Sequence, residues 1–248
     1  MTAEMIETSV EEPADMSIWD HIDELRGRLI KAMGALLLTT AIFIFGLYHE
    51  VLVFLARPVG GLDKLVQIEV TESIGVSMRV SLLAGFILAF PIIIYQVLAF
   101  IVPGLYQNER RYLYISIPIA TALFIGGVAF SYYVLLPTAV PFLLGFVKEV
   151  TSLPRISTYV NFVTNLLFWI GISFETPLLV FLLAKFNVVT PGFLLRQWRY
   201  AIVIIAILSA LITPTIDPVS MGLLMAPLFA IYLLSILFAK LARPVERK

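Results

Sequence analysis

Residues 169–183 read WIGISFETPLLVFLL, an apolar run that contains one carboxylate, Glu175, and one proline, Pro177. Such runs dominate the chain, because 60% of its 248 residues are hydrophobic, only 14% are charged, and the mean hydropathy is +0.97. An ordinary soluble domain is roughly 45–50% apolar and about 25% charged. The composition therefore predicts an all-α integral membrane protein.

Six apolar stretches are each bounded by polar or charged residues, and we place them at 29–53, 76–101, 112–136, 159–183, 200–212 and 219–239. A helix needs about 20 residues to cross a hydrocarbon core about 30 Å thick, so the first four are long enough. The fifth would reach only about 20 Å, and Pro227 interrupts the sixth. These two are either short crossings or one re-entrant hairpin. We favour two short crossings, because Asp217 in the turn would be costly to leave in hydrocarbon.

The placement of Lys and Arg predicts the orientation, because short cytoplasmic loops carry an excess of basic residues. On one side of the spans lie Arg26, Arg28, Lys31, Arg110, Arg111, Lys185, Arg196, Arg199, Lys240, Arg243, Arg247 and Lys248. On the other side lie Arg57, Lys64, Arg79, Lys148 and Arg155. We therefore expect both termini in the cytoplasm. We expect a disordered acidic tail over 1–16, one concave six-helix domain over 17–243, and a cytoplasmic tail over 244–248.

Catalytic and metal-site motifs are absent from the sequence. The 17 basic and 17 acidic residues cancel, which gives no support to a nucleic-acid partner, and with no cysteine there is neither a disulfide nor a thiolate metal site. No G-x-S-x-G nucleophile motif occurs. His49 and Glu50 are not followed by the second histidine of a zinc protease motif. We therefore expect a protein that is not an enzyme and that uses no cofactor or metal.

Two acidic clusters lie at the expected cytoplasmic side, SIWDHIDELRGRLIK at 17–31 and AFIVPGLYQNERR at 99–111. Glu24 lies four residues before Arg28, a spacing at which an ion pair contributes about 0.2–0.5 kcal/mol to a helix. Glu109 follows Asn108, the expected N-cap, and an acid in the first turn favours the helix dipole. Local helix structure alone could explain both clusters.

Four motifs resemble those of the TatC family, the polytopic core of the twin-arginine protein translocase. They are HIDELRGRL at 21–29, FPIIIYQVLAFIVPGLYQNERR at 90–111, GISFETP at 171–177, and TPTIDPVS with a following MAP at 213–227. The resemblance runs in order from about residue 18 to residue 243. It implies a receptor in the cytoplasmic (inner) membrane that binds signal peptides with consecutive arginines and helps to move folded proteins across that membrane.

The resemblance also implies functional residues. Glu24 and Glu109 match acids that accept the signal arginines. The implied signal-peptide site further includes four residues of the same two motifs, His21, Arg26, Phe100 and Leu105. The fourth-helix motif contributes a buried acid and two neighbours, which are Glu175, Phe174 and Pro177. Asp217 matches the acid of the last external loop, whereas Leu233 stands where many relatives have Glu.

The implied partners are single-span subunits of the TatA and TatB type, signal peptides with their folded cargo, and membrane lipid, with self-association in a larger complex. The implied energy source is the membrane potential or the proton gradient. Guanidinium groups suit carboxylates because planar bidentate hydrogen bonds add geometry to charge, whereas Lys offers a point charge. We hypothesise that Arg28 and Arg110 hold the empty carboxylates and are exchanged when the signal docks.

Two other classes of function stay open. A buried Glu175 would suit a proton- or ion-coupled small-molecule transporter. In a purely structural membrane scaffold, the polar residues would form hydrogen bonds that hold neighbouring helices together. We predict that Glu175 faces the concave interior of the bundle. Asn161, Thr164, Asn165 and Ser173 lie on the same span, and positions 161, 165 and 172–175 follow helical spacing closely enough to form part of one polar stripe. The role of Glu175 is either an interhelical hydrogen bond, worth about 0.6 kcal/mol, or a hydrated pocket that receives the signal peptide's apolar segment or a small subunit's polar side chain.

Overall fold

The computed structural model describes residues 18–102, 107–145, 153–213 and 218–242, and within these ranges every regular element is helical. The expected all-α membrane class is thereby confirmed. Five helical stretches in the described ranges are long and apolar enough to cross a membrane, and a sixth apolar helix is shorter. Both expected tails, Leu105 and Asp217 lie outside the described residues.

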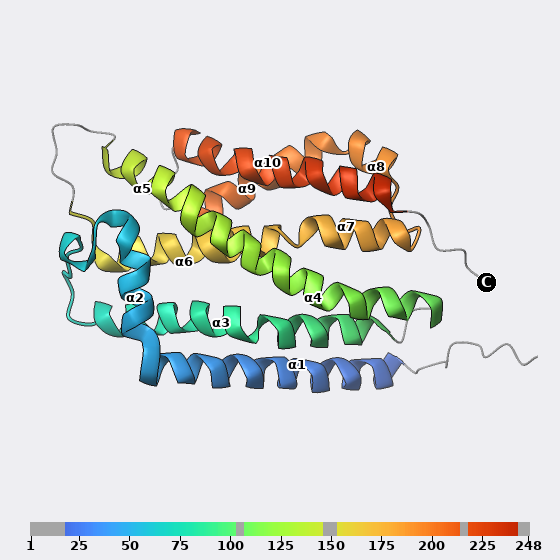
Figure 1. Ribbon diagram of the computed structural model, residues 1–248, viewed down its shortest axis with the longest axis horizontal. Coiled ribbons are helices and arrows are strands. Elements are labelled where there is room, and N and C mark those ends of the chain that lie inside the picture. The colour runs from blue at the N-terminus through green and yellow to red at the C-terminus, as the bar shows by residue number, and fades with distance from the viewer. Residues whose placement is uncertain (1–17, 103–106, 146–152, 214–217, 243–248) are drawn as a thin grey trace, which may run out of the picture.

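The long helices run roughly side by side and share two ends (Figure 1). At one end α1 (Ile18–Ile42) begins, α3 (Glu72–Ile101) ends and α10 (Pro218–Leu241) ends, and we name it the terminal end. The opposite end carries residues 57–71 and the start of α6 (Ile156–Ser173), and we name it the loop end. Many large apolar side chains point outward along these helices. A water-soluble surface would not carry so many, whereas lipid accommodates them.

The first apolar stretch is not one straight helix, as 29–53 had suggested. A five-residue π-helix, Phe43–Leu47, follows α1 and precedes α2 (Tyr48–Ala56). Figure 1 shows α2 turning away from α1 across the loop end of the bundle. Leu47 has φ −128 and ψ 5, which departs from helical geometry and marks the bend. Hydrophobic periodicity does not reveal such a bend, because apolar residues continue on both sides of it.

The third and fourth stretches are also interrupted. The third comprises α4 (Gln107–Phe130), a π-helix (Ser131–Leu135) and α5 (Leu136–Gly145). In the fourth, α6 ends at Ser173 and α7 (Thr176–Lys185) begins after a turn at Phe174 and Glu175. Pro177 lies in the first turn of α7, because it has no N–H to donate and its ring clashes with the preceding turn of a continuous helix. Two turn residues, Phe174 and Glu175, therefore separate α6 from α7.

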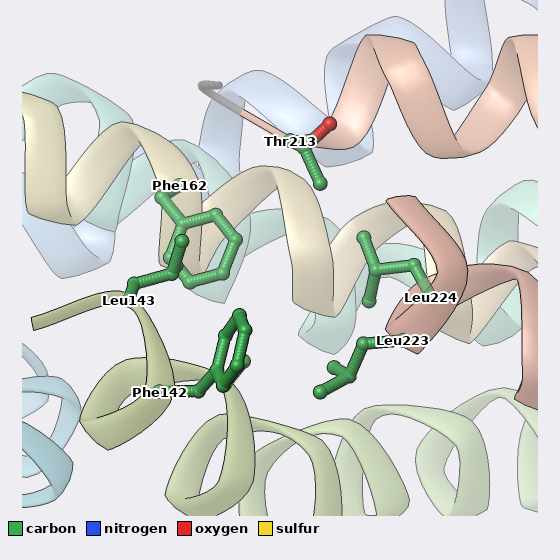
Figure 2. Close-up of a pocket in the computed structure, with 7 residues that line it drawn as sticks. Phe142, Leu143, Phe162, Thr213, Leu223 and Leu224 are labelled. Atoms are coloured by element: carbon green, nitrogen blue, oxygen red, sulfur yellow. The ribbon is translucent and has the colours of Figure 1, made fainter. Parts of the chain in front are cut away.

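The last part of the chain forms α8 (Pro191–Arg196), α9 (Trp198–Ile212) and α10. The expected break at Pro227 was wrong, because α10 continues through this proline, and its total of 24 residues is long enough to span a bilayer. The α9 helix has 15 residues and reaches only about 22 Å. Figure 2 shows Thr213, directly after α9, near Phe142 of α5 and Phe162 of α6, around a pocket of about 10 Å³.

Close helix contacts at two glycine positions set the packing between the helices. A Cβ on Gly85 of α3 would lie 2.7 Å from the backbone nitrogen of Thr40 on α1. A Cβ on Gly127 of α4 would lie 3.0 Å from the Cα of Gly171 on α6. Around the second contact, Phe90 and Phe124 stack with ring centroids 3.9 Å apart. These contacts hold α1 to α3 and α4 to α6 at distances that larger side chains would prevent.

Candidate functional site

The first candidate site lies at the terminal end, on the opening turns of α1. The Glu24 carboxylate accepts hydrogen bonds through Oε1 from both Nε and Nη2 of Arg28, the first at 2.9 Å. The His21 Nδ1 lies 3.9 Å from Oε2 of the same carboxylate. The Glu24 side chain is only 21% exposed, and its Oε2 is buried with no hydrogen-bond partner among the described residues. One oxygen of the acid is thus held by Arg28, and the other has no donor within the described part of the chain.

An aromatic contact joins this turn of α1 to the end of α3. The imidazole of His21 stacks on the ring of Phe100, with centroids 4.3 Å apart and planes 20° apart. Such a ring pair contributes about 0.5–1.5 kcal/mol beyond the area that it buries. Three expected site residues from two distant motifs, His21, Glu24 and Phe100, are therefore brought together. Their proximity follows from the close packing of α1 against α3.

Of the other residues expected at this site, the structure describes the side chain of Arg26 but not those of Leu105 and Glu109. Arg26 is exposed on α1. Glu109 belongs to the first turn of α4, as its sequence context predicted, but its side chain lies outside the described residues, as does all of Leu105. The expected ion pair between Glu24 and Arg28 is present. The hypothesised pair between Arg110 and Glu109 involves the Glu109 side chain, which lies outside the described residues.

The second candidate site surrounds Glu175, at the break between α6 and α7. This residue lines a pocket of about 200 Å³ between α3, α4 and α7, whose other described lining is almost entirely apolar, with Leu98, Leu113 and Leu182 among it. Glu175 is half-buried, and its Oε1 is buried without a hydrogen-bond partner among the described residues. An unpaired polar atom in such surroundings costs about 1–3 kcal/mol. The Oε1 atom therefore takes no part in an interhelical hydrogen bond among the described residues, whereas the carboxyl group as a whole has a backbone contact with Phe124 of α4.

The polar side chains of the fourth span have local or distant partners, and their alignment with Glu175 in one stripe stays a prediction. The Thr164 hydroxyl donates to the carbonyl of Val160, and the Ser173 hydroxyl donates to the carbonyl of Trp169, so both are satisfied within their own helix. Asn161 faces a different pocket, near the loop end.

Sequence reasoning missed two polar contacts between helices. Arg79 on α3 donates through Nη1 to the amide oxygen of Asn161 on α6. Arg155 binds Glu72 through Nε and Glu69 through Nη2, the latter pair at 2.7 Å. A basic residue inside an apolar stretch, as Arg79 is, was the available signal, but its partner lies far away in the chain. Among the described residues, no group of three or more His, Asp or Glu side chains could hold a metal ion.

Comparisons with known proteins agree with this geometry. The family model described as Sec-independent protein translocase protein (TatC) matches residues 20–227. A protein of that name from Koribacter versatilis is 36% identical over 94% of this chain and 88% of its own length. Another, from Carboxydothermus hydrogenoformans, is 35% identical over 95% of this chain and 97% of its own. A crystal structure of the twin-arginine translocase receptor TatC superposes with a TM-score of 0.81 at 35% identity, covering 90% of this chain and 99% of that one.

Proposed function

Because the chain belongs to the TatC family of Sec-independent protein translocase proteins, we propose that it is the receptor of a twin-arginine translocase that binds Arg-Arg signal peptides at its terminal end. The named relatives are translocase proteins, so a small-molecule transporter gains no support. Bound signal peptides would commit their folded cargo to transport. The protein itself performs binding and positioning, without catalysis.

The observation that carries this proposal is the state of the Glu24 carboxylate. One of its oxygens is held by Arg28, and the other is buried with no hydrogen-bond partner among the described residues. A signal arginine would displace the Arg28 guanidinium from Oε1, and a rotation of the carboxyl group would then let Oε2 accept the second donor of that arginine. A second arginine would bind Glu109, at the start of α4. A partly buried carboxylate gains more from such a pair than the roughly 1 kcal/mol available in bulk water.

Arg26, Phe100 and Leu105 complete the proposed surface. The stacked rings of His21 and Phe100 hold the first turns of α1 against the end of α3, so the Glu24 carboxylate is fixed before the peptide arrives. A preorganised acceptor loses less side-chain entropy on binding than a mobile one. Phe100 is half-buried and offers part of its ring to an apolar residue next to the arginines.

The proposed orientation puts the terminal end in the cytoplasm and the loop end outside the cytoplasmic membrane. The basic residues at helix ends support it, because Arg26, Lys185 and Lys240 all lie near the terminal end. Asp217 would then lie in an external loop. The receptor would act with single-span subunits of the TatA and TatB type and with further copies of itself.

The pocket beside Glu175 is proposed to act after signal binding. Its volume of about 200 Å³ and its apolar lining suit part of a helical segment. The carboxylate oxygen without a partner would accept a hydrogen bond from a polar side chain of that segment, from either the signal peptide or a small subunit. Phe174 and Pro177 maintain the break that exposes this acid.

Binding of synthetic signal peptides to the purified protein in lipid nanodiscs tests the proposal. A peptide with Arg-Arg should bind about tenfold or more tightly than the same peptide with Lys-Lys, because Lys cannot form the bidentate pair. A transporter or a scaffold would show no such preference. Equal affinity for the two peptides would remove the proposed function.

A further inference from the structure

A polar pocket of about 360 Å³ lies at the loop end, between α3 and α6, away from both sites described above. Its lining includes Glu69, Glu72, Gly75, Arg79, Arg155 and Asn161. Glu72, Gly75 and Arg79 follow one another at helical spacing, so they lie on one face of α3. The pocket is therefore a groove along the first two turns of this helix.

The deeper part of the pocket carries a positive charge. Arg79 lies seven residues into α3, about 10 Å along the axis from Glu72. Its guanidinium donates to the Asn161 amide oxygen, and no carboxylate of the described residues lies within ion-pair distance of it. A charged side chain within a membrane span is costly, and such residues generally pair or bind a ligand. Arg79 thus has donors available for an anionic group.

The outer part of the pocket carries the opposite charge. Glu69 and Glu72 share the single guanidinium of Arg155, so this cluster has one net negative charge. The hydrogen bonds from Arg155 to Glu69 and then to Glu72 raise the pKa of this arginine. The Glu72 side chain is only 3% exposed, and its Oε2 is buried without a hydrogen-bond partner among the described residues. The outer cluster therefore retains acceptor capacity.

Backbone hydrogen bonds fix this outer cluster in place. The Val66 N–H donates to the Pro154 carbonyl at 3.1 Å, and the Ile156 N–H donates to the Val66 carbonyl at 3.0 Å. These bonds tie the segment before α3 to the start of α6. The two ends of the pocket thus keep a fixed separation, with the negative charge toward the loop end and the positive charge toward the membrane centre.

We propose that this pocket binds the headgroup of a zwitterionic phospholipid that carries a primary ammonium group, as phosphatidylethanolamine does. The lipid phosphate contacts Arg79 and Asn161, and the ammonium group contacts Glu69, whose side chain is 61% exposed. In a phospholipid at this end of a spanning helix, the phosphate lies nearer the hydrocarbon than the ammonium group does. The pocket has the matching order, with Arg79 deeper and the acidic side chains farther out. Arginine suits phosphate because its planar donors bind two oxygens at once.

The lipid acyl chains have a matching surface on the same helix. Ile74, Met78 and Leu82 are exposed and spaced four residues apart, so they form an apolar stripe beside the pocket. Gly75 lies between the headgroup pocket and this stripe, and no atom lies within 4 Å of a Cβ built on it. The open space at Gly75 gives the glycerol part of the lipid a passage. The proposal stands independently of signal-peptide binding at the terminal end.

Native mass spectrometry of the intact protein, with defined additions of phosphatidylethanolamine, phosphatidylglycerol or phosphatidylcholine, tests the proposal. Wild-type protein should bind phosphatidylethanolamine about tenfold more tightly than phosphatidylglycerol, which has no ammonium group. It should also bind it more tightly than phosphatidylcholine, whose ammonium has no hydrogen to donate. Equal binding of all three lipids would overturn the proposal.

Two variants localise the lipid. Arg79→Gln removes the phosphate partner, and Gly75→Phe fills the pocket from a position where a Cβ meets no atom. Gly75→Phe should lose the preference for phosphatidylethanolamine, and Arg79→Gln should weaken the binding of all three lipids, because each of them carries a phosphate. Lys64→Gln, which removes an exposed charge of the same end outside the pocket, should change neither property. Retained preference in Gly75→Phe, or an equal loss in Lys64→Gln, would overturn the proposal. An unchanged melting temperature in detergent shows that each variant is folded.

Discussion

The hydroxyl of Thr39 on α1 donates a hydrogen bond to the backbone carbonyl of Gly85 on α3, at 2.9 Å. The bond is possible because Gly85 has no side chain, which lets the two helices approach closely. Glu24 and His21 lie on the same α1 helix, and Phe100 lies on the same α3 helix. This contact near the middle of α3 therefore supports the geometry of the proposed signal-peptide site at the terminal end.

Substitution of Gly85 by Ala should force α1 and α3 apart. The added Cβ would lie 2.7 Å from the Thr40 nitrogen, which is backbone and cannot move aside. We expect a loss of about 1–3 kcal/mol in the free energy of unfolding and a lower melting temperature in detergent. Gly34→Ala is the matched control, because a Cβ at Gly34 on α1 meets no atom within 4 Å. Equal melting temperatures for the two variants would show that the close contact does not stabilise the bundle.

Replacement of Glu175 by Ala should reduce the export of folded cargo without lowering the stability of the protein. Because the Oε1 atom is buried without a partner among the described residues, its removal should leave the melting temperature unchanged or higher. Signal-peptide affinity should also be unchanged, since Glu175 lies away from His21 and Glu24. Export of a folded reporter protein in cells should fall several-fold. A melting temperature that falls in parallel with export would instead support the structural role, and export at the normal rate would exclude both roles.

The crossing of α9 can be tested by chemical labelling. The chain has no native cysteine, so the single substitution Thr215→Cys, between α9 and α10, reports one position. We expect a membrane-impermeant thiol reagent to label this variant from outside the cell, as it should label Lys64→Cys. The variant Gln197→Cys, before α9, should be labelled only from the cytoplasm. Labelling of the Thr215→Cys variant only from the cytoplasm would establish a re-entrant hairpin and refute the crossing.

A crossing by α9 would also bring a local change in the bilayer. Its 15 residues span about 22 Å, whereas the hydrocarbon core is about 30 Å thick. The bilayer beside α9 would thin, at a cost of fractions of a kcal/mol per Å of mismatch. A thinner bilayer at this position would ease the passage of large cargo.

Arg28 should compete with the signal arginine for Glu24. Its removal in Arg28→Gln frees Oε1 of the carboxylate, so Arg-Arg peptides should bind about twofold more tightly, given the modest worth of an i,i+4 pair. Lys31→Gln removes the same charge from a nearby exposed position on α1 and serves as the control. Titration calorimetry with the same peptide compares the two. An equal gain in both variants would indicate a general electrostatic effect rather than exchange at Glu24.

The sequence predicted the helical class, the main apolar stretches and the pair between Glu24 and Arg28. These features could be predicted because hydropathy and i,i+4 spacing depend only on residues that are close together in the sequence. The bend after Ile42 and the continuity of α10 through Pro227 were not predicted. Both depend on how neighbouring helices compensate for irregular backbone, and that information is spread over distant parts of the chain.

The candidate sites show the same division. Glu24 and Glu175 were identified from motifs, but the stack of His21 on Phe100 required the close approach of α1 and α3. The pocket at the loop end joins Arg79 to Asn161, residues 82 positions apart. No spacing rule connects such residues. Only the packing of α3 against α6 places them together.

The most direct test of the proposed receptor is a double-mutant cycle between Glu24 and the signal arginines. Affinities of the Arg-Arg and Lys-Lys peptides are measured by calorimetry for the wild-type protein and for Glu24→Gln. If Glu24 reads an arginine, the substitution should weaken Arg-Arg binding by about 1.5–3 kcal/mol. It should weaken Lys-Lys binding much less, which gives a coupling energy of about 1 kcal/mol or more. The same preference for Arg-Arg over Lys-Lys in wild type and variant would contradict the assignment of Glu24 as an arginine reader.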